Sequence, residues 1–528
     1  MVTRWWQQGE WWWSSEARPS LFSLYQKPLT VSRFHSDIIA PFLRNSAVHK
    51  TRNAFFIDEK EYAYEKLRTR IAVLLGAVTN MKGETVAIIT HDHIDTYAAI
   101  WACWLCGKNY VPLNPNSPVD LNNRIKSQVA LAGIIDSTET SQWSDASGQD
   151  ADSMLEQASL FVQDDNQVAY ILFTSGSTGV PKGVPITFGN IAAFVDAFYK
   201  MGYTVSENDR VLQMFELTFD LSVMSYLIPQ LNGACVYTIP QGRIKFSYIF
   251  ELLDEHQLTI ALMVPSMLNF LRPYFDEIDC PNLRYSLFCG EALHLDILEE
   301  WAERVPNARI DNVYGPTENT IFCTYYTYNR AGNNPHHNGI LTIGTSMAHS
   351  ACTVMNEDDK PAAVDEIGEL CLSGAQLTPG YLNNPELNQT AFFEYHEGGH
   401  STRYYRSGDL CRLSADGNLM YAGRKDTQVK IQGFRVELSE VEFQAKKALN
   451  EKTNTVAFTQ ENSQGIHEIF LVIECETLDE NALKVALKNS LPAYMLPKSI
   501  FTLAAFPLNV NGKIDRKTIK QQFSAHVL

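Results

Sequence analysis

A glycine- and hydroxyl-rich segment at residues 170–183 (YILFTSGSTGVPKG) carries the strongest chemical signal in the sequence. It continues a β-rich run at 168–173 and contains one lysine, Lys182. Gly176 and Gly179 let the backbone approach a ligand, and backbone N–H groups with a lysine are typical of phosphate binding. No Walker A pattern fits, and an ordinary polar hairpin loop is the alternative. The segment therefore predicts a phosphate site, with hydroxyl donors from Thr174, Ser175, Ser177 and Thr178.

Five more segments add to this signal at separate places along the chain. Together with residues 170–183 they resemble the ordered motifs of the adenylate-forming (ANL) superfamily, which contains acyl-CoA synthetases, luciferases and the adenylation domains of peptide synthetases. The resemblance covers nearly the whole chain and implies ATP and Mg²⁺ as cofactors. The five segments are 107–114 (GKNYVPLN), 312–320 (NVYGPTENT), 405–410 (YRSGDL), 423–437 (GRKDTQVKIQGFRVE) and 511–516 (NGKIDR).

The resemblance implies a nucleotide site. Tyr314 would supply a flat aromatic face for adenine, and Asn312 a hydrogen bond to the base. Asp409 would accept from both ribose hydroxyls, with Arg424 assisting. Turn chemistry is the alternative for Asp409, because aspartate favours turns. Three further residues are expected to contact the nucleotide: Gly290, Glu291 and Gly315.

The phosphate end of this site has its own implied residues. Glu318 offers a hard oxygen ligand for Mg²⁺, and Thr317 would donate to the α-phosphate. Lys182 and Lys513 are the expected catalytic lysines. A carboxylate that attacks the α-phosphorus meets like-charge repulsion, and a positioned ammonium at Lys513 relieves it electrostatically. A solvated lysine on the Asn-Gly turn before it is the alternative reading of Lys513.

The family also implies a rotation of a small C-terminal domain about Asp426. Lys513 would leave after adenylation, and residues 430–433 would approach the thiol of a carrier protein. The sequence itself supports only the division into two domains and the position of the hinge. Turn chemistry is again the alternative for Asp426.

Residues 219–224 (FDLSVM) indicate the substrate class. In amino-acid-activating members of the family, the residue at the position of Asp220 pairs with the α-ammonium of the substrate. Burying that cation requires a carboxylate partner, so Asp220 favours an amino acid over a fatty or aryl acid. The alternative is an aspartate that caps a helix beginning near Leu221.

The resemblance implies an apolar side-chain pocket, which excludes charged side chains. FDLSVM and residues 288–292 (FCGEA) are similar to the D-alanine–carrier protein ligases, but Ile321 and Phe322 replace their small residues. The added bulk predicts a smaller substrate, glycine, with D-alanine second. The chain is accordingly similar to the glycine–carrier protein ligases of lipid A aminoacylation. The expected lining is Leu221, Met224, Leu262, Leu287, Cys289, Val313, Ile321 and Phe322.

The alternation of short apolar strands with helices predicts an α/β fold. Strands are expected at 84–90, 211–214, 259–264 and 286–289, and a helix at 95–107. After about residue 365 the pattern changes to strands and hairpins, and the last hundred residues read as a small α+β domain. We expect an N-terminal extension (1–30), a large layered α/β adenylation core with several subdomains (31–425) and a small, mobile C-terminal lid domain (426–528).

Composition excludes several other classes. A net charge of −17 argues against non-specific nucleic-acid binding. No run of about 18 apolar residues predicts a transmembrane helix, and the tryptophan-rich start lacks the pattern of a secretory signal. Ten scattered cysteines fit a reduced, cytoplasmic protein, and Cys103 and Cys106 read as helix thiols in an apolar run.

The expected partners are a small amino acid and a separate acidic carrier protein with a phosphopantetheine thiol, since no carrier motif follows Lys513 in the sequence. An acyl- or aryl-CoA ligase of the same fold is the main rival, and a catalytically inactive binding module is a second. The sequence leaves open glycine against D-alanine, the carrier's identity, the oligomeric state and the role of the tryptophans.

Overall fold

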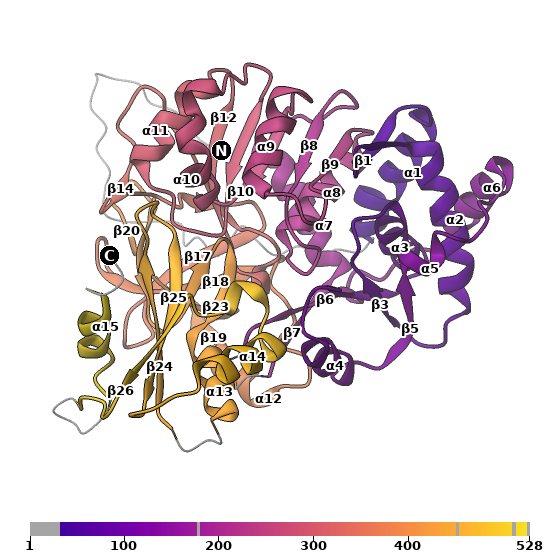
Figure 1. Cartoon of the computed structure of the whole chain (residues 1–528). Helices are drawn as coiled ribbons and strands as arrows, with labels where there is room; N and C mark the ends of the chain where they lie inside the picture. The colour runs from indigo at the N-terminus through magenta and orange to yellow at the C-terminus, as the bar shows by residue number, and fades with distance from the viewer. Residues whose placement is uncertain (1–31, 177–179, 450–452, 509–513, 525–528) are drawn as a thin grey trace, which may run out of the picture. The chain divides into compact units, whose positions relative to one another are not determined.

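The computed structural model describes residues 32–176, 180–449, 453–508 and 514–524. Ser32–Leu528 form one compact unit, drawn in Figure 1. The predicted N-terminal extension (1–30) lies outside the described residues.

A nine-stranded sheet carries three of the residues predicted to surround the substrate, Leu262, Leu287 and Val313. Its six central strands are parallel, and its outer strands are antiparallel. Their order is β16 (Thr345–Ser346), β13 (Thr324–Thr327), β12 (Arg309–Tyr314), β11 (Tyr285–Phe288), β10 (Ile260–Met263), β8 (Arg210–Gln213), β9 (Cys235–Thr238), β1 (Asn53–Ile57) and β2 (Lys60–Ala63).

Side chains alternate between two buried faces of this sheet. Leu262 packs into one hydrophobic cluster and its neighbour Met263 into another. The second cluster includes α9 (Lys245–Asp254), α10 (Ser266–Leu271) and α11 (Leu295–Arg304), which lie together over the sheet in Figure 1. Strands buried on both faces need continuous apolar runs, which explains why they were recognisable in the sequence.

A helix that is buried all round covers the other face. Every residue of α8 (Leu221–Leu231) is buried. Its serine hydroxyls are satisfied locally, since Ser225 Oγ donates to the Leu221 carbonyl at 3.1 Å. The same cluster contains residues of α1 (Ala40–Val48), α2 (Tyr64–Asn80), α3 (Ile94–Leu105) and α7 (Phe188–Lys200).

A five-stranded sheet presents the predicted phosphate loop. Its order is β5 (Leu131–Asp136), β3 (Thr85–Ile89), β4 (Asn109–Leu113), β6 (Val168–Thr174) and β7 (Lys182–Thr187). Only β6 and β7 pair antiparallel, and the loop joins them. Peripheral helices of this part of the chain are η2 (His35–Ile39), α4 (Val119–Ser127), α5 (Ser137–Thr140) and α6 (Gly148–Ala158).

A third, antiparallel sheet follows along the chain. It contains β17 (Ser350–Met355), β18 (Ile367–Gly374), β19 (Phe392–Glu397), β20 (His400–Leu413) and β21 (Leu419–Arg424). A hairpin around residues 415–417, in the region where the sequence predicts strands and hairpins, joins β20 to β21. The remaining short elements before the C-terminal region are η3 (Arg272–Glu277), η4 (Thr317–Asn319), β14 (His336–His337), β15 (Ile340–Leu341) and α12 (Pro385–Ala391).

The C-terminal region has its own small core. Its elements are β22 (Gln428–Ile431), β23 (Phe434–Glu437), α13 (Leu438–Ala448), β24 (Thr455–Glu461), β25 (His467–Glu474), α14 (Glu480–Ser490), η5 (Ala493–Met495), β26 (Ser499–Leu503) and α15 (Arg516–Ser524). The prediction of a large α/β core followed by a smaller domain is confirmed, whereas the boundary at residue 426 and the domain's mobility stay predictions.

All ten cysteines are free; Cys103 is buried in α3 and Cys106, at the end of that helix, is half-buried. None of the helices within the described ranges is long and apolar enough to cross a bilayer.

Candidate active site

Asp220, the carboxylate predicted to pair with the substrate's ammonium group, lies directly before α8. Its side chain is 6% exposed, and Oδ2 accepts a hydrogen bond from the Ile321 N–H at 3.1 Å. Its side chain makes no capping hydrogen bond to α8, so the alternative reading as a helix cap is wrong. Burial raises the pKa of Asp220 to about 7, against the lowering effect of the Ile321 amide and the Thr317 hydroxyl.

The eight apolar residues predicted to line the substrate pocket all belong to one buried cluster. Leu262 and Leu287 are paired across the parallel strands β10 and β11, and Val313 lies on β12. Leu221 and Met224 come from α8. The other three of the eight follow a strand end or the η4 turn: Cys289, Ile321 and Phe322.

Phe322 has a second contact that the sequence did not indicate. Its ring packs edge-to-face on Phe194 of α7, with the ring centroids 5.0 Å apart. Part of its bulk therefore fills space between the sheet and α7. Within the pocket, burial raises the pKa of the Cys289 thiol to about 12, so this cysteine is a small apolar group at neutral pH.

A strained turn connects Glu318 to this pocket. Thr320 has φ 52° and Ile321 φ 72°, a region that β-branched residues rarely adopt and that costs about 1–3 kcal/mol per residue. Gly315 lies against the turn, because a Cβ there would be 2.4 Å from Phe322 Cα. The turn is thus held in a conformation that local propensity disfavours.

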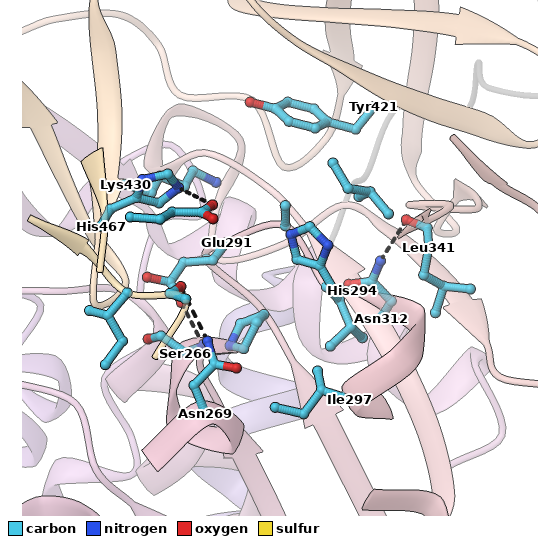
Figure 2. A pocket seen from close by; sticks show the side chains of 18 of the residues that line it. Ser266, Asn269, Glu291, His294, Ile297, Asn312, Leu341, Tyr421, Lys430 and His467 are labelled. Carbon is cyan, nitrogen blue, oxygen red and sulfur yellow. Dashed lines mark hydrogen bonds and ion pairs between the residues drawn. The ribbon is translucent and has the colours of Figure 1, made fainter. Parts of the chain in front are cut away.

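Several of the residues predicted to contact the nucleotide line a cavity of about 920 Å³. Tyr314 is 6% exposed and donates from its hydroxyl to Asp409 Oδ2 at 2.5 Å. Arg424 Nη1 donates to Asp409 Oδ1 at 2.8 Å. Figure 2 shows Glu291, Asn312, Tyr421 and Lys430 around the cavity. Among predicted residues it is lined by Gly290, Glu291, Asn312, Val313, Tyr314 and Arg424, whereas Asp220 and Asp409 do not line it.

Two predicted residues of this pocket, Asn312 and Glu291, already have hydrogen-bond partners in the protein, and Gly290 lies close to Gly433. Asn312 Nδ2 donates to the Thr342 carbonyl at 2.9 Å. Glu291 accepts from the N–H groups of Ser266 and Gly433, both at 2.8 Å. Gly290 has φ 96°, and a Cβ there would lie 3.6 Å from Gly433 Cα. A base hydrogen bond from Asn312 therefore stays a prediction.

The predicted hinge residue lies in a compact charge cluster. Arg424 contacts both Asp426 carboxylate oxygens at 2.7 Å, and Asp426 Oδ1 also accepts from the Gln428 N–H. Asp426 therefore makes a turn hydrogen bond as well as an ion pair. Whether the chain pivots here stays a prediction.

The phosphate loop is described on both sides of a gap. Ser177, Thr178 and Gly179 lie outside the described residues, as does Lys513 with its turn. At Gly176 a Cβ would be 2.1 Å from the Val180 carbonyl oxygen, so the turn requires glycine. Thr174 Oγ1 is buried without a hydrogen-bond partner.

Residues of the C-terminal region contact the phosphate end of the site. Ser175 Oγ donates to the Arg435 carbonyl at 3.0 Å, and Lys182 Nζ lies 3.7 Å from Glu437 Oε1. Burial lowers the pKa of Lys182, and the nearby Arg435 adds to this effect. Glu440 accepts from the Gly176 N–H, while burial raises its pKa to about 7.

Glu318 is fully buried and remains ionised. Arg435 Nη1 donates to Glu318 Oε2 at 2.7 Å, and the Tyr381 hydroxyl donates to Oε1 at 2.6 Å. Burial opposes ionisation, but Arg435, Tyr381 and Lys182 together lower the pKa of Glu318 to about 2. Thr317, predicted to contact phosphate, hydrogen-bonds Asp220.

This set of residues fits a magnesium–triphosphate ligand. The unpartnered Thr174 hydroxyl, the glycine turn and Lys182 supply phosphate donors, and Glu318 supplies a permanently charged oxygen ligand. Within the described ranges, no group of three or more His, Cys, Asp or Glu side chains could hold a metal alone. Mg²⁺ bound through one carboxylate and substrate phosphates matches its usual coordination.

Sequence reasoning missed several residues of the site. Arg435 and Glu437 lie in the 423–437 motif, but the motif does not reveal that they meet Glu318 and Lys182. Lys430 Nζ lies 5.6 Å from the centre of the Tyr314 ring. Gln376, which holds the 319–322 turn, lies outside all the quoted motifs.

The fold and the pocket define an enzyme of the adenylate-forming type, with an α/β core and a smaller C-terminal domain. A family model described as AMP-binding enzyme matches residues 42–382, and the chain belongs to this family. Enzymes of this family use ATP and Mg²⁺.

The chain is similar to bacitracin synthase 1 of Bacillus licheniformis (30% identity, 83% of this chain and 8% of that protein). It is also similar to the D-alanine–D-alanyl carrier protein ligase of the same species (28% identity, 89% of this chain and 96% of that protein). The chain thus spans under a tenth of the synthase but nearly all of the ligase. Among solved structures, the Vibrio cholerae adenylation domain AlmE in complex with glycyl-adenosine-5′-phosphate is similar (27% identity, 95% of this chain and 99% of that chain, TM-score 0.81).

Proposed function

We propose that this protein activates a small amino acid, glycine first, as its aminoacyl-AMP and transfers it to the phosphopantetheine thiol of a separate carrier protein. The carrier would pass it on to a cell-envelope acceptor such as lipid A. The proposal depends mainly on the surroundings of Asp220. Asp220 is a buried carboxylate whose described hydrogen-bond partners are neutral, the Ile321 amide and the Thr317 hydroxyl. A buried carboxylate calls for a cation, and an α-ammonium group supplies one.

The size of the substrate is argued from the packed surroundings of Asp220. The neighbouring side chains are apolar and almost completely buried, which favours a substrate without a long or charged side chain. The similar AlmE structure contains a glycyl adenylate, and the similar Bacillus ligase acts on D-alanine. Because one methyl group changes selectivity by about 1–3 kcal/mol, D-alanine is the second candidate.

The contacts at the phosphate end support two alternating occupants. Arg435 places a positive charge on Glu318, where the Mg²⁺ ion is expected, and Glu437 places a negative charge beside Lys182, where phosphate is expected. A bound magnesium–triphosphate and these C-terminal contacts would therefore exclude each other. We propose that adenylation occurs with residues 430–440 displaced, and thiol transfer with them in contact, as they are here.

ATP–pyrophosphate exchange tests the first half of the proposal. The assay compares glycine, both alanines, β-alanine, serine, leucine and a fatty acid. We expect glycine to give the highest kcat/KM, with D-alanine next. Equal turnover of leucine or the fatty acid would contradict the inference that the pocket around Asp220 selects a small amino acid.

Lys513 is tested in the same assay. Lys513→Ala should abolish exchange while nucleotide binding remains, and Lys517→Ala, on the following helix, serves as its matched control. Normal exchange by Lys513→Ala would exclude the proposed catalytic role. Transfer to coenzyme A in place of a holo-carrier protein would favour the rival CoA ligase.

A further inference from the structure

The turn at residues 319–322 is held by one buried side chain from a distant part of the chain. Gln376 is fully buried, and its Nε2 lies 3.3 Å, 3.1 Å and 2.9 Å from the carbonyl oxygens of Asn319, Thr320 and Phe322. Its two amide hydrogens are shared among these three acceptors. The turn carbonyls would otherwise be buried without donors.

The glutamine is itself fixed on its other sides. Ser350 Oγ donates to Gln376 Oε1 at 3.1 Å, and Thr320 Oγ1 donates to the Gln376 backbone carbonyl at 2.5 Å. These contacts orient the amide so that its nitrogen faces the turn. A strained conformation persists only where its surroundings impose it, and Gln376 supplies three hydrogen bonds of those surroundings here.

The turn also positions a hydrogen-bond donor for Asp220. The positive φ of Ile321 accompanies an orientation in which its N–H donates to Asp220 Oδ2. If the turn relaxed to an ordinary conformation, the peptide plane would rotate and this hydrogen bond would be lost. The carboxylate would then lose the amide that orients it in a closely packed pocket.

We propose that Gln376 is a positioning residue for amino-acid recognition: its amide holds the 319–322 turn so that the Ile321 N–H aims the Asp220 carboxylate at the substrate's ammonium group. This inference rests on the proposed function. Gln376 itself does not contact the substrate, because it acts through the backbone of the turn.

The test compares Gln376→Met and Gln376→Glu with a control glutamine. Methionine keeps the volume but has no donor, and glutamate turns the donor into an acceptor that faces carbonyl oxygens. Gln230→Met is the control, because Gln230 is equally buried but pairs with Trp101, away from the turn. Pyrophosphate exchange gives the KM for glycine and the KM for ATP separately.

We expect the glycine KM to rise about tenfold or more in both Gln376 variants, with the ATP KM changed by less than about twofold. Gln230→Met should change neither. An equal rise in the KM values for glycine and ATP would show that Gln376 does not act through Asp220. An unchanged glycine KM would show the same.

Hydrogen exchange adds a measurement that needs no substrate. In the absence of ligand, amides 319–323 should exchange about tenfold faster or more in Gln376→Met than in the wild type and in Gln230→Met. Unchanged exchange would overturn the inference, whatever the substrate. If the wild type activates no amino acid, the proposed function fails while this result still decides whether Gln376 holds the turn.

Discussion

At the amino-acid end of the site, the hydrogen bonds of Asp220 and of the 319–322 turn are made to residues of the large core. At the phosphate end, Ser175, Lys182 and Glu318 contact residues 435–437 of the C-terminal region. The first set consists mainly of buried hydrogen bonds with directional geometry, and the second depends on charge. Charges can be exchanged for those of phosphate and Mg²⁺, whereas a strained backbone turn has no such substitute. The comparison indicates a rigid recognition end and an exchangeable phosphate end.

The largest effect is expected for Asp220→Asn. This substitution keeps the shape but removes the charge, and an unpaired buried ammonium costs about 3–5 kcal/mol. We expect kcat/KM for glycine in pyrophosphate exchange to fall by at least about a hundredfold, because about 1.4 kcal/mol corresponds to tenfold. The KM for ATP should change little. Asp311→Asn, at a buried carboxylate that pairs with Arg309, is the control for the loss of a buried charge outside the predicted substrate residues. If the KM for ATP rises to a comparable extent, the substitution affects the general stability of the protein and not amino-acid recognition.

Gly433→Ala tests the exchangeable end. Gly433 has φ 82°, and a Cβ there would lie 2.4 Å from Val264 Cγ1. The added methyl group obstructs the contact between residues 430–440 and the core, and overpacking of this kind costs about 1–3 kcal/mol. We expect loading of a holo-carrier protein to fall about twentyfold, with pyrophosphate exchange within about twofold.

The matched control for this change is Gly417→Ala. Gly417 has φ 84° but nothing lies within 4 Å of the added Cβ, so the substitution carries the backbone strain without the collision. Loss of loading in both variants would assign the effect to strain. Loss of exchange in Gly433→Ala would contradict the separation of the two ends.

The sequence was informative where one residue type has one physical use. The strand runs around Leu262 and Leu287 are apolar because both sheet faces are buried, and their positions are confirmed to within one or two residues. Asp220 was predicted from its position in the family resemblance, because a buried ammonium group requires a carboxylate partner. These signals are local in the sequence.

The missed residues depend on contacts between distant segments. Gln376 holds a turn more than fifty positions away, and Arg435 meets Glu318 across 117 positions. Propensity also disfavours positive φ at Thr320 and Ile321, so no local rule predicts the turn. Bulk at Phe322 could be inferred, but its contact with Phe194 could not.

The pH dependence of substrate binding should reveal the recognition end. Burial raises the pKa of Asp220 to about 7 in the protein without substrate, so the carboxyl group gains a proton as the pH falls through 7. Only the ionised form pairs with an ammonium group. We therefore expect the glycine KM to rise about tenfold from pH 8 to pH 6, since affinity weakens up to tenfold per unit below the pKa. A flat glycine KM across this range would contradict the assignment, and the ATP KM measured in the same titration is the control.

The smallest effect is expected for Glu440→Gln, on carrier loading. Burial raises the pKa of Glu440 to about 7 while it contacts Gly176; displaced into water it would have its ordinary, lower pKa. The contact state therefore binds the extra proton, so contact is favoured at low pH and weakens as the pH rises through about 7. Glutamine removes this titration and keeps a group that accepts from the Gly176 N–H. Loading from preformed aminoacyl-AMP, relative to the wild type, should rise about threefold between pH 6 and pH 8. Glu480→Gln, at an exposed glutamate on α14, is the control, and its loading relative to the wild type should be the same at pH 6 and pH 8. If the relative loading of Glu440→Gln is also the same at both pH values, the proton on Glu440 does not control contact between the C-terminal region and the phosphate loop.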